Sequence, residues 1–233
     1  MLEPILDTTL SFLRQKEVIF WLAVASGLVQ ALGYLIYGFK AFRNHIVPNA
    51  SSWAMFAYGT LLLTFLEWES DAGGALLVLP IVCVVASTVI FFLCLQRGRF
   101  VWPQDIEDRV SFSTDLCLTV LYILAWLALF FDFFSKEQMG IAVLAFLIAS
   151  NATTVTSFIP ILREAYYEPS HEHQSPWVLW TVAYFLLLLV TAGEESDWVL
   201  YLYPVANIVL HLSIAWMVRH SRQERYKKKT APA

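Results

Sequence analysis

Two polar side chains lie one helical turn apart inside an apolar segment near the end of the chain. Asn207 and His211 are four residues apart, so a helix would place them on the same face. The Asn207 amide can donate and accept hydrogen bonds, and His211, the only histidine within an apolar segment, can take up a proton near neutral pH. This pattern predicts a site for a small polar solute, with His211 as a candidate for proton coupling. A buried histidine that is only hydrogen-bonded to a neighbour is the alternative interpretation.

Further polar groups are expected at mid-depth in two other apolar segments. Ser150 and Asn151 begin an unusually polar stretch that continues to Thr156, and Gln30 occupies a corresponding depth in the first apolar segment. Polar groups buried in a membrane cost free energy, which makes them candidates for a functional role. The predicted solute-binding residues are Asn207, His211, Asn151, Ser150 and Gln30.

The acidic side chains suggest one further candidate. Glu67, at the end of the second apolar segment, is a second candidate for proton coupling, with a hydrated carboxylate at the membrane surface as the alternative. Asp115 follows Ser113 and Thr114, where a helix cap is expected. Glu172 stands between two histidines, His171 and His173, in a spacing that is a poor zinc pattern, so we expect a solvated loop and no metal site.

The composition predicts a membrane protein. Of 233 residues, 58% are hydrophobic and only 15% are charged, which is more apolar surface than a soluble domain of this length can bury. The sequence contains no glycine-rich phosphate loop, no paired carboxylates at mid-depth and no nucleophile elbow, so we expect neither an enzyme nor a bound cofactor.

Seven apolar segments are long enough to cross a bilayer as helices, which need roughly 20 residues. Helices are predicted because a chain exposed to lipid must satisfy its own backbone hydrogen bonds and because these segments lack the alternation of barrel strands. The segments are 18–39, 52–68, 72–95, 116–134, 139–162, 176–192 and 198–218.

The distribution of basic residues predicts the orientation. With the N terminus outside, every Lys and Arg except Arg14, Lys16 and Lys136 lies in an inner, cytoplasmic segment. The basic tail, residues 219–233, is then cytoplasmic and is expected to contact anionic lipid headgroups. Binding to nucleic acid is the other use of such a tail and is not expected this close to a membrane span.

An internal repeat organises the spans. A shift of 124 residues places Ser51 on Ser175, Trp53 on Trp177 and Pro80 on Pro204, and upstream a shift of 120 places Arg43 on Arg163. The chain therefore divides into an outer segment (1–17), a three-helix repeat (18–96), an inner loop with a linker helix (97–136), a second repeat (137–218) and the tail. One linker span gives the two repeats the same orientation, a 3+1+3 arrangement with a pseudo-twofold axis along the membrane normal.

The join within the second repeat resembles a known family. Ser157-Phe158-Ile159-Pro160, followed by Arg163 and then Ser175-Pro176-Trp177, resembles the PQ-loop signature of the PQ-loop and SWEET (MtN3-like) superfamily. Ile161 stands in place of the glutamine, and Lys40 occupies the matching proline position in the first repeat. The resemblance implies a transporter that moves a small polar metabolite by alternating access between two three-helix bundles. Asn207 resembles the substrate-contacting asparagine of the family, and its counterpart in the first repeat is Cys83.

Prolines and small residues suggest where helices bend or meet. Pro160, Pro80 and Pro204 are candidate hinges, because proline removes a backbone hydrogen bond inside a helix, although they could serve packing alone. Gly33 and Gly59 are expected to allow close helix contacts. The tryptophans near helix ends are expected to be interfacial anchors: Trp21, Trp53, Trp68, Trp177 and Trp198.

The function expected from these features is transport of a sugar, an amino acid or a nucleoside-like solute, with proton coupling left open. A seven-helix receptor or scaffold that binds a ligand or peptide without moving it is the alternative. The expected partners are a small-molecule solute and membrane lipid, and a homo-oligomer remains open.

Overall fold

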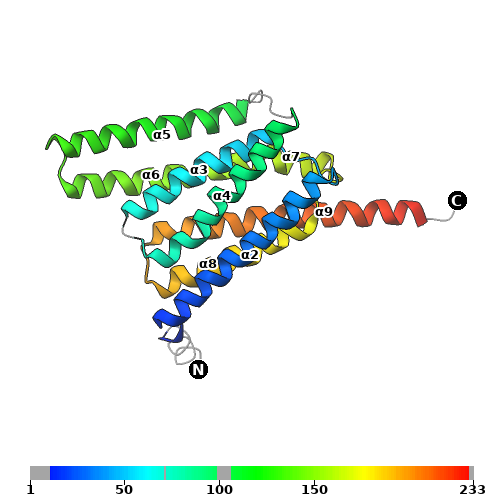
Figure 1. Cartoon of the computed structure of the whole chain (residues 1–233), viewed down its shortest axis with the longest axis horizontal. Coiled ribbons are helices and arrows are strands. Elements are labelled where there is room, and N and C mark those ends of the chain that lie inside the picture. Colours follow the sequence, from blue (N-terminus) through cyan, green and yellow to red (C-terminus); the bar gives the residue numbers. More distant parts are fainter. Residues whose placement is uncertain (1–10, 71, 99–105, 231–233) are drawn as a thin grey trace.

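The protein is an all-helical chain in the computed structural model, which describes residues 11–70, 72–98 and 106–230, without the side chains of 107, 108 and 222–230. No strand occurs in these ranges, which confirms the predicted all-α class (Figure 1). The helices are α2 (Lys16–Phe42), α3 (Ala50–Glu69), α4 (Gly74–Gln96), α5 (Ile106–Phe130), α6 (Lys136–Ser157), α7 (Ile159–Tyr167), α8 (Gln174–Gly193), the 3₁₀ turn η1 (Trp198–Tyr201) and α9 (Leu202–Thr230).

Six of the helical segments are long and apolar enough to cross a membrane, which supports the predicted membrane protein. They are Lys16–Phe42, Gly74–Gln96, Arg109–Phe130, Lys136–Tyr167, Gln174–Gly193 and Trp198–Ser221. The predicted segment 52–68 forms α3 but is not one of the six. Its serines, threonines and Glu67 lower its mean hydropathy.

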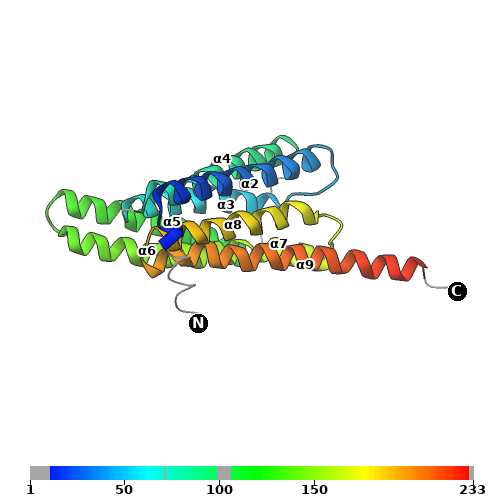
Figure 2. The ribbon, with the colours of Figure 1, turned by 90° about the horizontal axis from the view of Figure 1, so that it is seen from below.

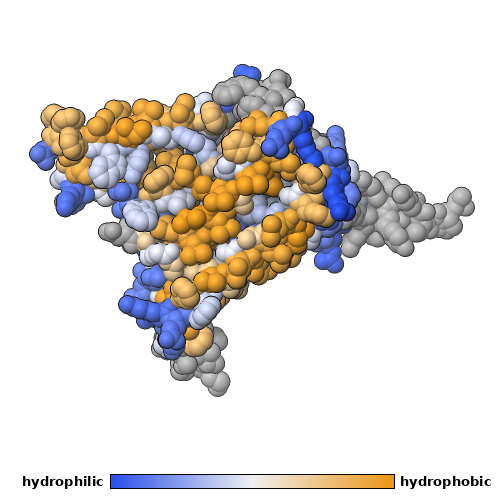
Figure 3. All heavy atoms as spheres, viewed as in Figure 1, coloured by the Kyte–Doolittle hydropathy of each residue, from blue (hydrophilic) through white to orange (hydrophobic). Residues whose placement is uncertain are grey.

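The outer surface of the helices is apolar. Leu35 on α2 is 71% exposed and Val85 on α4 is 61% exposed, and many other large apolar side chains point away from the core. Figure 3 shows this apolar surface over α2 and α4, with hydrophilic residues gathered toward the helix ends. Such a surface is stable in lipid and would aggregate in water.

The helices pack in two layers that meet where α2 packs on α8 and where α3 packs on α6. Figure 2 shows α2 and α4 on one side and α8 and α9 on the other. The most extensive contacts of α2 are with α8 and α4, and those of α3 are with α4 and α6. On the second side α8 packs on α9, and α5 packs mainly against α6.

We call the end that holds loops 43–49 and 168–173 the inner end and the opposite end the outer end. At the inner end the Val47 amide donates a hydrogen bond of 3.0 Å to the His171 carbonyl, which joins the two loops. Arg97, just after α4, donates to the carbonyls of Ala41 and Phe42 at the end of α2. At the outer end, Ser135 and Gln138 form a capping box that starts α6.

The structure corrects three details expected from the sequence. The segment 139–162 is not one helix, because α6 ends at Ser157 and α7 begins at Ile159, with Pro160 in its first turn. Pro204 lies in the first turn of α9, where a missing N–H costs no helical hydrogen bond, whereas Pro80 lies inside α4. Asp115 is not a helix cap: α5 begins at Ile106, and Asp115 is buried within it, 1% exposed.

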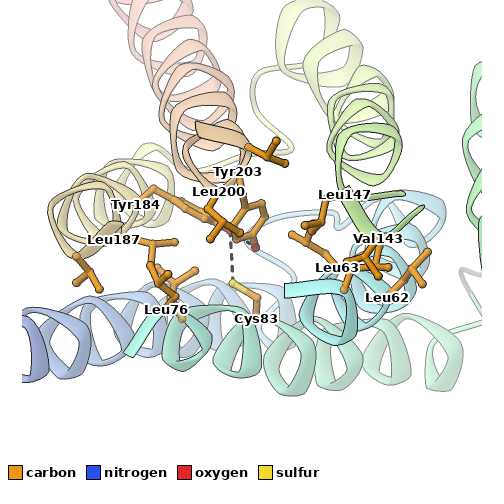
Figure 4. Close-up of a cluster of buried hydrophobic side chains, with 14 of the residues drawn as sticks. Leu62, Leu63, Leu76, Cys83, Val143, Leu147, Tyr184, Leu187, Leu200 and Tyr203 are labelled. Atoms are coloured by element: carbon orange, nitrogen blue, oxygen red, sulfur yellow. Dashed lines mark hydrogen bonds between the residues drawn. The ribbon is translucent and has the colours of Figure 1, made fainter. Parts of the chain in front are cut away.

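The buried core consists of two clusters of different composition. The cluster toward the outer end is rich in leucine and contains Leu63, Leu187 and Leu200, together with Cys83, Tyr184 and Tyr203 (Figure 4). The cluster toward the inner end is rich in aromatic residues and contains Tyr37, Trp53, Trp177 and Trp180. The polar candidates of α9 lie where the two clusters meet.

Candidate functional site

Three tryptophans form the centre of the inner cluster. Trp53, Trp177 and Trp180 are each at most 1% exposed, and the ring of Trp180 lies 4.9 Å from that of Trp177 and 6.1 Å from that of Trp53. The prediction that Trp53 and Trp177 are interfacial anchors is therefore wrong. A shift of 124 residues superimposes Trp53 and Trp177 in the sequence, but this match did not indicate that the two residues are buried.

The remaining predicted anchors are exposed. Trp21, Trp68 and Trp198 are 66%, 67% and 66% exposed and lie near the outer ends of α2, α3 and η1. Their position agrees with an anchoring role, because an indole ring is favoured where apolar and polar surroundings meet.

Close packing of α2 on α8 fixes the position of Trp180. A Cβ on Gly33 would lie only 2.4 Å from Trp180 Nε1, so no other residue fits without a shift. Trp180 Nε1 donates to the Gln30 carbonyl at 3.2 Å, one turn before Gly33, and Ser26 Oγ donates to the Ala183 carbonyl at 2.8 Å. The predicted close contact at Gly33 is confirmed.

A small enclosed pocket lies among these rings, between the two layers. The cavity has a volume of about 20 Å³ for the centre of a water molecule, which leaves room for water but not for a sugar or an amino acid. Asn207 and His211 both line it, so the structure brings these two predicted residues together. The other lining residues are Tyr34, Trp53, Phe56, Thr60, Cys83, Thr154, Phe158, Trp177, Trp180, Tyr184 and Tyr203.

His211 is enclosed by aromatic rings. Its ring centroid lies 5.0 Å from those of Phe158 and Tyr184 and 5.5 Å from that of Trp177. Its Nδ1 lies 2.7 Å from the Asn207 carbonyl oxygen. Because a carbonyl can only accept, Nδ1 carries the hydrogen, and in the neutral ring Nε2 is then an acceptor.

A chain of hydrogen bonds crosses the pocket on its outer side. Gln30 Nε2 donates to Cys83 Sγ at 3.0 Å. Cys83 Sγ lies 3.5 Å from the Tyr184 hydroxyl, and that hydroxyl lies 3.0 Å from the Tyr203 hydroxyl; Figure 4 shows these three side chains. The chain connects α2, α4, α8 and α9. Asn207 Nδ2 donates to the Tyr203 carbonyl at 2.9 Å, which places the amide next to this chain.

Three predicted solute-binding residues do not line the pocket. Gln30 is 1% exposed and contacts lining residues without lining the pocket itself: its side chain bonds Cys83 and its carbonyl accepts from Trp180. Ser150 and Asn151 are buried, and Asn151 Nδ2 donates to the Leu147 carbonyl of its own helix at 2.8 Å. Thr154 lines the pocket from α6 instead, because it lies one turn farther toward the inner end.

Glu67 is buried away from the pocket. It is 4% exposed, so the alternative of a hydrated surface carboxylate is wrong. Its Oε2 has no hydrogen-bond partner among the described residues. The structure therefore leaves Glu67 as a buried acid near the outer end of α3.

Glu172 is the functional candidate that the sequence did not indicate. The expected solvated loop contains a fully buried carboxylate, whose Oε1 accepts a hydrogen bond from the Tyr37 hydroxyl at 3.0 Å and whose Oε2 accepts one from Trp177 Nε1 at 2.9 Å. Burial raises the pKa of Glu172 to about 8. Its neighbour His171 lies 2.9 Å from the carboxylates of Glu164 and Glu168.

The pocket has the chemistry of a site for an uncharged molecule. No Lys, Arg, Asp or Glu is among its lining residues, whereas hydroxyl, amide, thiol and imidazole groups are. Among the described residues no group of three or more His, Cys, Asp or Glu could hold a metal ion.

Comparison with known proteins identifies no relative that would assign this pocket a role. No protein-family model matches the chain, and no curated protein or solved structure is significantly similar to it.

Proposed function

We propose that the protein is a membrane carrier that moves a small uncharged polar solute by alternating access, with Asn207 and His211 in the solute site. The observation that carries this proposal is that many of the residues lining the pocket form pairs related by the repeat offsets. The offsets of 120 and 124 residues relate Tyr34 to Thr154, Trp53 to Trp177, Phe56 to Trp180, Thr60 to Tyr184 and Cys83 to Asn207, and all of these residues line it.

The helix contacts support the same 3+1+3 organisation, with α5 as the linker. The first helix of each repeat contacts the second helix of the other repeat: α2 contacts α8, and α6 contacts α3. Within each repeat the third helix contacts the other two: α4 contacts α2 and α3, and α9 contacts α6 and α8. A pocket on a pseudo-twofold axis between two such bundles suits a carrier that opens to either side. The PQ-loop and SWEET resemblance, with seven spans and an outer N terminus, belongs to this proposal.

The state of the pocket supports an occluded conformation. Aromatic side chains close it toward the inner end, and the leucine-rich cluster lies toward the outer end. Solute entry therefore requires the two bundles to separate at one end, which is the movement that alternating access needs.

The pocket lining favours a sugar or a nucleoside-like solute over an amino acid. Aromatic rings bind the flat face of such a molecule, and the pocket's neutral polar groups can form hydrogen bonds with its hydroxyl groups. An amino acid would bring two charges into a pocket that has no charged side chain. The desolvation of these charges would cost free energy that no ion pair in the pocket offsets.

A ligand screen followed by an uptake assay tests the proposal. Sugars, nucleosides and amino acids are first compared by the rise in thermal stability of the purified protein. Uptake of the stabilising solute is then measured in proteoliposomes. Asn207→Ala and His211→Ala should each weaken apparent affinity about tenfold, the effect of losing one buried hydrogen bond of about 1.4 kcal/mol.

Ser213→Ala is the matched control, because Ser213 also lies on α9 and its hydroxyl bonds only the Val209 carbonyl of its own helix. All three variants should keep the wild-type circular dichroism spectrum. Wild-type uptake by both pocket variants would remove Asn207 and His211 from the solute path. Binding of a solute without uptake would favour a receptor or scaffold.

A further inference from the structure

Glu172 connects the two proposed bundles at the inner end. Tyr37 is on α2, whereas Glu172 and Trp177 are in and just after the loop between α7 and α8. Trp53 Nε1 of α3 donates to the Tyr37 hydroxyl at 3.3 Å, which extends the chain of hydrogen bonds to a fourth segment. Trp53 and Trp177, which the repeat relates, therefore both contribute to one network that includes the Glu172 carboxylate.

This network is closed to water in the structure. Glu172, Tyr37 and Trp177 are 0% exposed, and Trp53 is 1% exposed. Separation of α2 from α8 at the inner end would break the Tyr37–Glu172 hydrogen bond and would expose the carboxylate. The surroundings of Glu172 therefore depend on whether the inner end is closed.

We propose that Glu172 is the proton-binding residue of this protein, protonated while the inner end is closed and deprotonated when it opens. This inference rests on the proposed carrier function for its role in transport. It differs from the expectation that His211 or Glu67 takes up the proton, because neither of these residues bridges the two bundles with hydrogen bonds in the described structure.

The direction of the coupling follows from burial. Burial moves the pKa of Glu172 from 4.5, the value of an exposed glutamate, to about 8. At a pH between these two values, Glu172 is therefore protonated in the closed form and ionised in the open form. Proton binding stabilises the closed form. The closed form should be most stable below about pH 4.5 and should lose stability as the pH rises to about 8.

Several groups around Glu172 modify this titration. Hydrogen bonds from Trp177, from Tyr37 on α2 and from the backbone of His173 lower the pKa, and the Glu164 carboxylate on α7 raises it. The first two bonds favour the ionised form because a carboxylate accepts both. Burial outweighs them, since the pKa remains raised.

Infrared titration of the purified protein in liposomes tests proton binding without any solute. The probe is pH alone, and the signal is the carbonyl stretch of a protonated carboxylic acid. The difference between the wild-type and Glu172→Gln titrations removes the signal of the other buried acids, Glu67 and Asp115. This difference should contain one acid that is lost with a midpoint near pH 8. Glu168→Gln is the matched control, because Glu168 also lies near the inner loop but its side chain is 62% exposed.

Tyr37→Phe keeps the carboxyl group and provides a second variant. Removing a hydrogen bond that favours the ionised form should move the midpoint to higher pH. The absence of such an acid from the difference between wild type and Glu172→Gln, or a midpoint near 4.5, would overturn the proposal.

Hydrogen exchange of the inner loops tests the link to opening. After correction for the intrinsic pH dependence, amides in loops 43–49 and 168–173 should exchange faster above pH 8 than at pH 6 in the wild type, and this change should be absent in Glu172→Gln. Equal pH dependence in the two proteins would overturn the coupling. Because neither assay measures transport, failure of the solute uptake assay would leave these results intact, and failure here would leave uptake intact.

Discussion

At the scale of single residues, the pocket depends on small residues as much as on polar ones. Gly33 allows the Nε1 edge of Trp180 to approach α2, and Gly59 gives room to the buried Asp115, whose Oδ2 would lie 3.1 Å from an added Cβ. Both glycines let a side chain from another helix approach the backbone closely. The positions of polar groups in the core therefore depend on residues that carry no chemistry of their own.

Gly33→Ala should destabilise the protein. The added methyl group would meet Trp180 Nε1 and Cδ1, which lie 2.4 and 2.7 Å from the ideal Cβ position. Overpacking of this kind costs about 1–3 kcal/mol, more than the helix propensity that alanine adds. The measurement is the midpoint of thermal unfolding in detergent.

Gly140→Ala is the control for this substitution. Gly140 also lies in a helix, α6, and an added Cβ would have no neighbour within 4 Å. It should be neutral or stabilising by up to about 1 kcal/mol, because alanine favours helix. Equal midpoints for the two variants would contradict the close contact at Gly33.

At the scale of elements, the two proposed repeats differ most in their first helices. α2 runs without interruption from Lys16 to Phe42, whereas its counterpart is divided into α6 and α7 at Phe158. Pro160 explains the division, because it has no N–H to donate to the carbonyl one turn earlier and its ring clashes with that turn. The division turns α7 toward α9 and brings the Glu172 loop over the inner end.

Pro160→Ala should join α6 and α7 into one helix. Alanine can donate the missing backbone hydrogen bond, so amide exchange around residues 158–162 should slow by roughly tenfold, the effect of about 1.4 kcal/mol. Hydrogen exchange followed by mass spectrometry measures this change. If the join is a hinge, solute uptake should fall although the helix becomes more stable.

Pro204→Ala is the matched control for the hinge. Pro204 lies in the first turn of α9, where the N–H of an alanine would gain no helical partner. Exchange and uptake should therefore remain at wild-type levels. A similar slowing in both variants would show that the Pro160 ring is not what interrupts the helix.

At the scale of the whole molecule, α3 decides the number of membrane crossings. It lies between α4 and α6 in the bundle, although it is the helix that lacks the apolar character of the other six segments. A helix that is covered by neighbours can carry more polar residues than one that faces lipid. The bundle thus provides the surroundings that a seventh span of this composition needs.

Single cysteines on either side of α3 should lie on opposite sides of the membrane. His45→Cys precedes α3 and Ser70→Cys follows it. In a Cys117→Ser background, a membrane-impermeant maleimide added to intact cells should label Ser70→Cys at once and His45→Cys only after permeabilisation. Labelling of both from the same side would mean that α3 does not cross, and reversed sides would contradict the predicted orientation.

The local features of this protein could be read from its sequence. Each predicted apolar segment lies largely within helix, because helix formation in a membrane requires only a run of apolar residues and internal backbone hydrogen bonds. The shared face of Asn207 and His211 also follows from helical spacing alone. The proposed repeat offsets relate several residues that line the pocket, although the sequence did not show that these residues meet in one cavity.

Only the tertiary structure determined which polar groups reach the pocket. Whether Ser150, Asn151 or Gln30 faces it depends on the rotation of each helix, which is set by packing against helices far away in sequence. Burial of Glu172 likewise depends on the division at Pro160 and on Tyr37, 135 residues earlier in the chain. The physical reason is that hydropathy and periodicity are properties of one segment and indicate only whether it forms a helix in lipid. Burial and hydrogen bonding of a single side chain depend on which other segments pack against it.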